Sequence, residues 1–510
     1  MLKENTITRS AEMSASRSTV GWVIAISIAA GLALWMAPPY LFSEDIVPVV
    51  VVAALFALLL VIVLGLAITR HQPAKVTVYR LTLLMWWVIL VCEAVFDRMG
   101  DSTQAYQSNF SVEAYGEGVV WVLAFLTLGI LSIQQPDYIR RVFSGPYKWV
   151  TFFAVVCAGS VAYSTGKSYS GAWAFKLVLV VLLLQLGASM LTSLADVVTF
   201  LKVTLWGFFV LAIVPTVQAL SDTSTAFEGV GGRLNASPDA LTNTAGLLLL
   251  LSVILYSIEK QKMMIVTGLL ASAVMLMSLG KSAILASLIA IVIFFLLQKQ
   301  VGRSAAVLLG ITAVGLVVLS VTPVGAHLQS YEGAATLTGR TAIWTEGVNA
   351  VRQKWLLGHG YLSTYFSWSK NSGLAGDYTH LHNGFLEVAY NNGLIGLAIL
   401  LMIHFMILRN AFRSIRDASI LRARRPYDKE SSLAYILAVG FLALYANLTI
   451  NGLFNTTFGG RARSAFMLFL ALFVMADLLR RHITKMVGGT VAEVAPRRSD
   501  WFPVGVPERR

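Results

Sequence analysis

The sequence predicts an all-α fold, a polytopic helical bundle of about 12–14 transmembrane helices, because of its composition and the length of its apolar runs. Of the 510 residues, 57% are hydrophobic and only 13% are charged, and the mean hydropathy is +0.72. This composition excludes a soluble globular domain. Runs near the ~20 apolar residues that a membrane helix needs lie at 19–41, 46–68, 76–96, 118–133, 147–163, 171–190, 197–220, 240–258, 263–279, 282–297, 304–322, 393–408, 433–453 and 464–479.

The first predicted span marks the start of the membrane domain. Its polar leader is rich in Ser and Thr and no secretory cleavage site follows the span, so we expect it to remain as a signal anchor. We divide the chain into a cytoplasmic leader at 1–18, a membrane domain at 19–480 and a cytoplasmic tail at 481–510. The leader, and the tail beyond Val487, are expected to be disordered. Within the membrane domain, residues 323–392 form a long polar passage near the C-terminal third, predicted to be a large helical loop.

The distribution of Lys and Arg between alternate loops predicts the orientation of the chain. With the N-terminus inside, 26 of the 39 Lys and Arg residues fall in inside segments, 10 in outside loops and 3 within spans. Cytoplasmic loops carry such an excess of cations, so both termini are expected in the cytoplasm and the 221–239 and 323–392 loops on the opposite face. The net charge of +13 then matches anionic lipid, and nucleic acid is not expected as a partner.

The chain lacks the residue patterns of metal and nucleotide chemistry. Cys92 and Cys157 both lie in predicted spans, which leaves neither a disulfide framework nor a thiolate metal site. No HExxH, CxxC, Walker loop or strand-associated GxGxxG occurs, and the cytoplasmic loops are too short for a nucleotide-binding domain. We therefore expect no cofactor and no metal, and an energy source that is either a membrane-borne substrate or an ion gradient.

Arg340 stands at the start of a predicted amphipathic helix in the 323–392 loop. This helix is expected to begin near Thr338 and to lie on the membrane surface or against the bundle. A cation in the first turn opposes the helix dipole, so Arg340 on the apolar face favours an anionic partner, and a guanidinium beside free N–H groups suits phosphate. The alternative is an arginine that snorkels to lipid headgroups. The apolar stripe comprises Trp344, Val348, Val351 and Trp355.

His382 is the candidate general base, at the start of a second helix in the same loop. Asn383, which follows it, is a favourable N-cap residue. A helix N-terminus disfavours imidazolium, and neutral imidazole is the form that a general base needs. His380 is an alternative, because spacing alone does not assign roles within the pair, and Glu387 is a candidate to orient a histidine. A structural histidine and, although no third ligand is spaced to join the pair, a metal site are the other interpretations.

Three further features complete the candidate set. Arg233 follows a glycine-rich stretch of the 221–239 loop, where a ligand can approach the backbone closely, although a loop-end arginine facing lipid phosphate is an equal alternative. Lys281, in SLGKSA at an outside helix end, is a weaker candidate because interfacial lysines are common. Asn391, Asn392 and Gly393 are expected to end the second helix of the 323–392 loop in the manner of a C-cap.

The motifs T-G-R-x-x-x-W, W-L-L-G-H-G-Y, H-x-H-N-G-F-L-E and N-N-G-L-I-G occur in this order across residues 338–396. In this order the chain resembles the O-antigen ligase and polysaccharide polymerase superfamily, with a softer, topological likeness over about 197–480. Two departures stand out. The family often shows Pro-Asn after the first arginine where this chain has Pro238-Asp239, which weakens the placing of Arg233, and the predicted span count exceeds the family's usual dozen.

The resemblance implies a bacterial inner-membrane, multi-pass glycosyltransferase that is inverting, independent of metal, and active at the periplasmic face on undecaprenyl-diphosphate-linked oligosaccharide. It implies that Arg340 and Arg233 hold the diphosphate and that His382 is catalytic. The acceptor glycan would be another lipid-linked repeat in a polymerase or the lipid A core in a ligase, and the motif wording favours an exopolysaccharide polymerase, with other polysaccharide-assembly proteins as candidate partners. A transporter of lipid-linked glycan is the alternative from another class, disfavoured because its polar groups would lie near the bilayer midplane.

Overall fold

The protein is described by a computed structural model over residues 74–96, 121, 124, 125, 128, 143, 145–221, 238–321, 340–368 and 380–494. Within these ranges the chain forms helices joined by turns and bends, and no β-strand occurs, so the predicted all-α class is confirmed. The predicted spans 19–41 and 46–68, and most of 118–133, lie outside the described residues.

The predicted span at 76–96, and each predicted span from residue 147 onward, coincides with a helix. Three short 3-10 or π turns, η2 (Gly145–Tyr147), η3 (Val161–Tyr163) and η5 (Thr364–Trp368), accompany them. The α-helices are α3 (Ala74–Phe96), α7 (Lys148–Ser160), α8 (Lys167–Met190), α9 (Leu194–Ser221), α10 (Pro238–Glu259), α11 (Lys262–Ser278), α12 (Lys281–Leu297), α13 (Val301–Val321), α15 (Arg340–Gln353), α17 (Gly384–Arg424), α18 (Lys429–Phe454) and α19 (Ser464–Val494).

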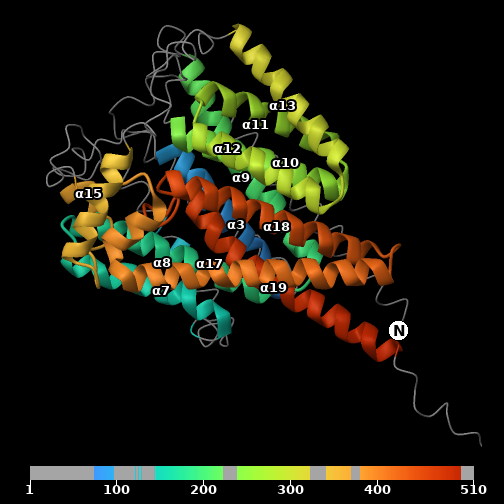
Figure 1. The fold of residues 1–510 in the computed structure, drawn as a ribbon. Coiled ribbons are helices and arrows are strands. Elements are labelled where there is room, and N and C mark those ends of the chain that lie inside the picture. The colour runs from blue at the N-terminus through green and yellow to red at the C-terminus, as the bar shows by residue number, and fades with distance from the viewer. Residues whose placement is uncertain are drawn as a thin grey trace, which may run out of the picture.

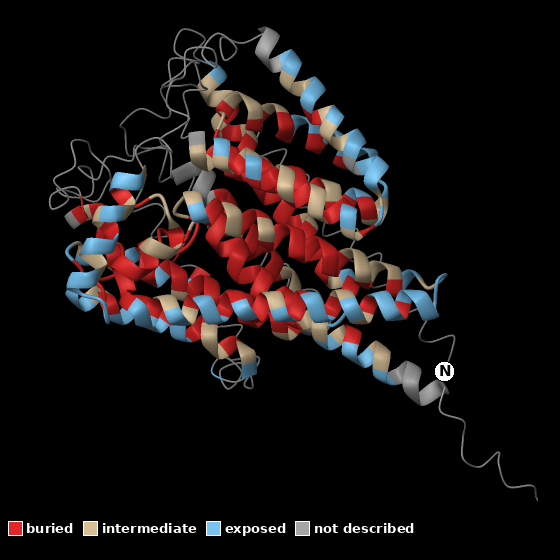
Figure 2. Cartoon of the chain, in the orientation of Figure 1, coloured by how far each residue is buried: buried red, intermediate tan, exposed pale blue. Residues whose placement is uncertain are grey.

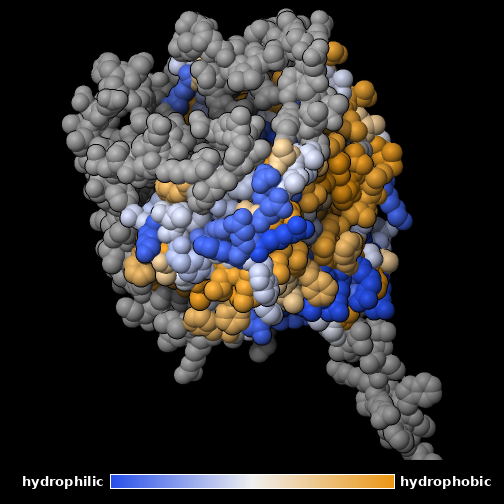
Figure 3. Space-filling model, turned by 60° about the vertical axis from the view of Figure 1, so that its left-hand side comes forward, coloured by the Kyte–Doolittle hydropathy of each residue, from blue (hydrophilic) through white to orange (hydrophobic). Residues whose placement is uncertain are grey.

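The apolar helices identify a multi-pass membrane protein. Five described helices, α8, α9, α10, α17 and α18, are long and apolar enough to cross a bilayer. Helices α11, α12 and α13 are shorter and equally apolar, and large aliphatic residues on them, including Leu285 and Leu309, are exposed. A broad hydrophobic surface is visible in Figure 3. Because such a surface would be costly in water, it indicates contact with lipid.

The helices pack as two connected groups, one around α10 and one around α17, as Figure 1 shows. Helix α10 packs against α9, α11, α12 and α18, while α17, α18 and α19 pack against one another. Helix α15 packs on α17 at one end of the bundle. Buried residues concentrate where the long helices meet, whereas most described residues of α13 are exposed or half-buried (Figure 2).

Two helices extend beyond their predicted limits. The chain does not leave the helix at the predicted Asn-Asn-Gly stop; α17 continues to Arg424, with Gly393 alone in a non-helical conformation. The stop signal was therefore read correctly as a local break but wrongly as an end, because an apolar run follows at once and resumes the helix. At the C-terminus, α19 continues to Val494. The disorder expected beyond Val487 was therefore wrong for residues 488–494.

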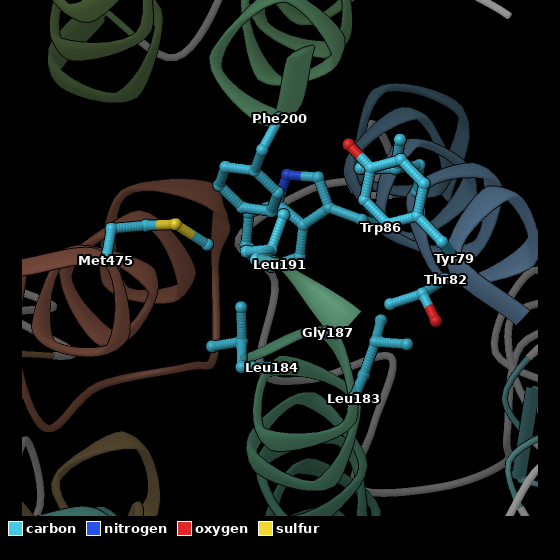
Figure 4. A pocket seen from close by; sticks show the side chains of 10 residues that line it. Tyr79, Thr82, Trp86, Leu183, Leu184, Gly187, Leu191, Phe200 and Met475 are labelled. Carbon is cyan, nitrogen blue, oxygen red and sulfur yellow. The ribbon is translucent and has the colours of Figure 1, made fainter. Parts of the chain in front are cut away.

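A small void lies in the bundle among α3, α8, α9 and α19 (Figure 4). Its volume is about 10 Å³, and its lining is apolar apart from the ends of a few side chains. A void of this size holds at most one water molecule. None of its lining residues belongs to the predicted site, so it is a packing feature of the bundle. It is lined by Tyr79, Thr82, Leu83, Trp86, Leu183, Leu184, Gly187, Leu191, Phe200 and Met475.

Candidate active site

Helix α15 begins at Arg340, close to the predicted start. Its buried residues are Ile343 and Gly347, whereas Val348 and Trp355 are exposed. These two residues of the predicted apolar stripe therefore do not dock on the bundle, and for them the expected placement on the membrane surface stays a prediction. The helix docks through a neighbouring face, and it ends before Trp355 is reached, so that residue no longer follows the helical period.

Contact with α17 selects the buried face of α15. A Cβ on Gly347 would lie 2.8 Å from the Leu386 side chain, so the glycine allows the two helices to approach closely. Trp344 packs beside this contact and its indole N–H donates to the backbone oxygen of Leu381 at 3.0 Å. The first turns of α15 and α17 are thereby tied together, and with them Arg340 and the histidine pair.

The W-L-L-G-H-G-Y motif pairs with the break in α17. At Gly393 the backbone is left-handed, with φ 65°, and the helix there leaves main-chain groups without helical partners. Residues 355–360 supply those partners, and Gly358 and Gly393 approach so closely that a Cβ on either would overlap backbone atoms. The bonds join His359 N–H to Tyr390 O, Gly360 N–H to Asn391 O and Leu394 N–H to Trp355 O, each at 2.8 Å.

The H-x-H-N segment forms a tight turn into α17. His382 has φ 49°, a left-handed conformation that is uncommon and costly for a residue other than glycine. Asn383 then adopts an extended conformation as the N-cap, and its side-chain oxygen accepts from the N–H groups of Phe385 and Leu386, both at 3.0 Å. The predicted N-cap is confirmed. Backbone strain of this kind is often located at functional positions.

Glu387 stabilises the turn that carries the two histidines by hydrogen bonds. It is fully buried, and its carboxylate accepts from the Leu381 N–H at 3.0 Å and from the Thr364 hydroxyl. Asn391 lies at 3.5 Å from the same carboxylate. Glu387 therefore orients the peptide between the two histidines, and not either ring directly, which refines the role expected for it.

We predict that Glu387→Ala lowers both stability and turnover. The substitution leaves the buried Leu381 N–H and Thr364 hydroxyl without an acceptor, at a cost of roughly 1–3 kcal/mol each, and releases the histidine turn. Glu387→Gln keeps one acceptor oxygen and should be milder. Thermal unfolding in detergent and transfer rate are the measurements. Glu346→Ala, which removes a half-buried carboxylate from α15, is the matched control. Wild-type stability and turnover in Glu387→Ala would contradict this role.

The two histidines form a close pair. Their ring centroids lie 4.1 Å apart. Burial, and next the charge of Arg340, lower the pKa of His382 from its ordinary value to about 4, while Asp239 opposes the shift. Burial and neighbouring cations also hold the pKa of His380 well below its ordinary value. Both rings are therefore neutral near pH 7, and within the described part of the chain the buried Nδ1 of His382 makes no hydrogen bond.

Arg340 lies beside this pair and is fixed by two oxygens. One terminal nitrogen, Nη1, donates to the backbone oxygen of Phe454 at 2.7 Å, and Nη2 lies 4.0 Å from Oδ2 of Asp239. Its side chain is 17% exposed, so the guanidinium is not extended into solvent. The structure thus brings Arg340 and His382 together, from helices that begin about forty residues apart in the sequence.

The turn between α18 and α19, residues 455–463, forms the floor of the site, with the end of α18. Asn383 Nδ2 donates to Leu453 O at 3.1 Å, and Asn391 Nδ2 donates to Gly459 O at 3.3 Å. The Tyr361 hydroxyl donates to Gly460 O at 3.0 Å. With the bond from Arg340 to Phe454 O, all four motifs of residues 338–396 are therefore anchored to a part of the chain near residue 455, outside the predicted polar loop.

Arg461 and Arg463 are the candidate residues that the sequence reasoning missed. Both carry charge close enough to His380 to lower its pKa. The signal that could have found them is a pair of cations in a short outside turn, where the positive-inside rule expects few. Both belong to the 10 Lys and Arg residues of the predicted outside loops.

Two other anion ligands were predicted, Arg233 and Lys281. Arg233 lies outside the described residues. Lys281 is exposed at the first position of α12. Its neighbour Ser282 accepts from Asn455 at 2.9 Å, so Lys281 lies at the same end of the bundle as Arg340, and its role stays a prediction.

Comparisons with known proteins bear on this region. Residues 266–401 match the family described as O-antigen ligase. The chain is also similar to the exopolysaccharide production protein ExoQ of Rhizobium meliloti (strain 1021), at 31% identity over 114 residues. That alignment covers 21% of this chain and 26% of the relative, so the chain matches only about a quarter of the relative's length.

The family match covers the part of the site that α15 and the first part of α17 form. It includes α11, α12, α13, α15 and the first part of α17, and with them Arg340, the histidine pair and Glu387. It does not reach the α18–α19 turn. Residues 266–401 are therefore similar to the O-antigen ligase family, and both comparisons support the resemblance to the O-antigen ligase and polysaccharide polymerase superfamily that the motifs indicated.

Proposed function

We propose that this protein is an inverting glycosyltransferase of cell-surface polysaccharide biosynthesis, which joins undecaprenyl-diphosphate-linked glycan units at the periplasmic face of the inner membrane. The observation that carries the proposal is a neutral, half-buried histidine pair beside a fixed guanidinium, at one end of a membrane bundle. Neutral imidazole accepts protons, and guanidinium binds phosphate oxygens. The family match and the likeness to an exopolysaccharide production protein support the same chemistry.

In the proposed reaction, a hydroxyl oxygen of the acceptor glycan attacks the anomeric carbon of the donor sugar. The bond between that carbon and the diphosphate oxygen breaks with its electron pair, which inverts the anomeric centre and releases undecaprenyl diphosphate. His382 takes the hydroxyl proton as general base. Arg340 stabilises the negative charge that grows on the leaving diphosphate, a task that fixed donors perform without reorganisation.

Incubation of the purified protein with a lipid-linked repeat unit, with and without lipid A core, tests the proposal and separates its two forms. We expect a ladder of lengthened glycans on the repeat unit alone, which identifies a polymerase. Single transfer that requires lipid A core would instead identify the ligase, the alternative function. Release of no undecaprenyl diphosphate under either condition would overturn the proposed transfer.

A chelation arm of the same assay addresses the metal. Within the described residues, no three His, Cys, Asp or Glu side chains are grouped as metal ligands. The guanidinium is proposed to meet the diphosphate charge in place of a metal, so transfer should survive EDTA. If chelation abolished transfer and Mg²⁺ or Mn²⁺ restored it, this part of the proposal would be wrong.

A transporter of lipid-linked glycan remains the alternative from another class, and the membrane-embedded charges disfavour it. Lys202 in α9 forms an ion pair with Glu259 in α10, and Lys176 in α8 lies over the rings of Trp121 and Trp173 at 4.7 and 4.3 Å. These cations are engaged within the bundle, whereas a transport path gathers its polar groups around a substrate near the midplane. The candidate groups described above gather at one end of the bundle.

The proposed orientation places the 323–392 loop in the periplasm and the 409–432 segment in the cytoplasm. The cation bias between alternate loops supports this. In a variant lacking Cys92 and Cys157, an impermeant thiol reagent should label Ser369→Cys in intact spheroplasts and should label Ser419→Cys only after lysis. The reverse pattern would contradict the topology and with it the periplasmic site.

The pH dependence of transfer should reveal the low pKa of His382. At about 4, this pKa predicts that kcat/KM falls as pH drops through about 4, not through the ordinary histidine value, because only neutral imidazole accepts the proton. A bound diphosphate places negative charge nearby and favours imidazolium, so the acid limb of kcat should lie at higher pH than that of kcat/KM. Coincident limbs near the ordinary histidine pKa would contradict the buried environment.

A further inference from the structure

The α18–α19 turn carries two arginines that the proposed mechanism does not yet use. Arg461 is only 7% exposed, although a buried guanidinium loses its hydration at a cost of several kcal/mol. It is held in an aromatic surround: its Cζ lies 4.8 Å from the ring centroid of Tyr365, 5.5 Å from that of Tyr169 and 5.9 Å from that of Trp173. Its Nε also donates to the Tyr169 hydroxyl. The position of Arg461 is thus fixed from several sides.

Arg463 is fixed in a different way and is more accessible. Its N–H donates to Arg461 O at 2.7 Å, and its own carbonyl accepts from Met467 N–H at 2.9 Å, so it is the last residue before α19. Its side chain is half-buried. A cation at the start of a helix opposes the helix dipole, as it does for Arg340 at the start of α15. An arginine therefore stands at the first position of α15 and directly before the first position of α19, where an anion would be favourable.

The three arginines flank the histidine pair. Tyr365 lies close to both Arg461 and His380, with its ring centroid 4.8 Å from the arginine Cζ and 6.5 Å from the centroid of the histidine ring. After the neighbouring histidine, Arg463 and then Arg461 are the main charges acting on His380, ahead of Arg340. For His382 the main charge is Arg340. Arg340 is thus associated with one ring of the pair, and the two turn arginines with the other.

We propose that Arg463, next to Arg461 in the same turn, takes the place that the resemblance gives to Arg233 as the second guanidinium of the donor site, and holds one phosphate of the diphosphate while Arg340 holds the other. This inference rests on the proposed function and names the residues that make its site selective for a diphosphate. A guanidinium fork matches the oxygens of one phosphate group, so two phosphates require two forks. The aromatic surround keeps Arg461 in place, and Arg461 in turn supplies positive charge beneath the phosphate.

The test is the preference for a diphosphate over a monophosphate. Binding of undecaprenyl diphosphate and of undecaprenyl monophosphate is measured on the full-length protein in detergent, for the wild type, Arg463→Gln, Arg463→Lys and Arg461→Gln. The wild type should prefer the diphosphate at least tenfold. Arg463→Gln should lose most of that preference while it still binds the monophosphate, because Arg340 remains. Arg463→Lys, which keeps the charge but not the fork, should be intermediate.

A purely structural role would weaken both lipids alike and leave their ratio unchanged, so the ratio separates recognition from misfolding. Arg461→Gln should reduce the ratio less than Arg463→Gln does. Arg352→Gln, at an exposed position on α15, is the matched control and should behave as the wild type. A wild-type ratio in Arg463→Gln would overturn the inference alone. Failure of the wild-type protein to bind undecaprenyl diphosphate would overturn the proposed function as well.

Discussion

His382→Ala is expected to reduce turnover by about a hundredfold to ten-thousandfold, the usual contribution of a general base, while donor affinity stays near that of the wild type. The ring is removed from the proton-transfer step, but the guanidinium that holds the diphosphate remains in place. The measurement is turnover beside the dissociation constant of the lipid-linked donor, at matched expression.

His380→Ala is the internal control for this prediction. His380 packs against His382, so its loss should disturb the pair and lower turnover less than loss of His382 does. If His380→Ala were the more damaging change, the roles within the pair would be exchanged. Wild-type turnover in His382→Ala would remove the histidine from the mechanism altogether, although the family relationship would stand.

Arg340→Lys is expected to remain largely inactive, with a loss of about a hundredfold to a thousandfold in rate, the range typical for removal of one charge-stabilising donor. Lysine keeps the charge but loses the planar fork. It also cannot reproduce the geometry in which Arg340 bonds to the Phe454 carbonyl while facing Asp239. Arg340→Ala should in addition weaken donor binding, and turnover and donor affinity are measured together.

Asp239→Asn is the companion variant for Arg340. It removes the facing carboxylate but leaves the hydrogen bond to Phe454, so the guanidinium should stay in position and donor affinity should hold or improve. Unchanged donor affinity in Arg340→Ala would contradict a role in binding the diphosphate. If Arg340→Ala were lost from the membrane and Arg340→Lys were not, the defect of the Ala variant would be one of folding. The role of Arg340 would then be tested by the turnover of the Lys variant.

Much of the fold could be predicted from the sequence because membrane helices are encoded locally. A run of about 20 apolar residues in lipid must form a helix to satisfy its own backbone groups. This reason applies to α8, α9, α10 and α18 equally, and their predicted positions are confirmed within a few residues. The N-cap role of Asn383 was likewise predictable, because it depends only on the adjacent turn.

Contacts between distant parts of the chain explain what could not be predicted. The buried face of α15 is chosen by the fit of Gly347 against Leu386. The main-chain groups that the break at Gly393 leaves without helical partners are bonded by residues 355–360, which are distant in the sequence. The amphipathic period of α15 did not identify the docked face, so tertiary packing, and not the period alone, selected the face that is buried.

The sequence by itself determined that this is an all-α membrane protein, that its candidate chemistry lies in the polar loop, and that Arg340 and the histidine pair are the groups to examine. Only the tertiary structure decided how they are combined. It placed Glu387 beneath the peptide between the histidines, and brought Arg461 and Arg463 beside His380 from about eighty residues away. The physical reason is that a site depends on which carbonyls, rings and charges meet in space, and that information is distributed over helices whose local sequences encode only their own formation.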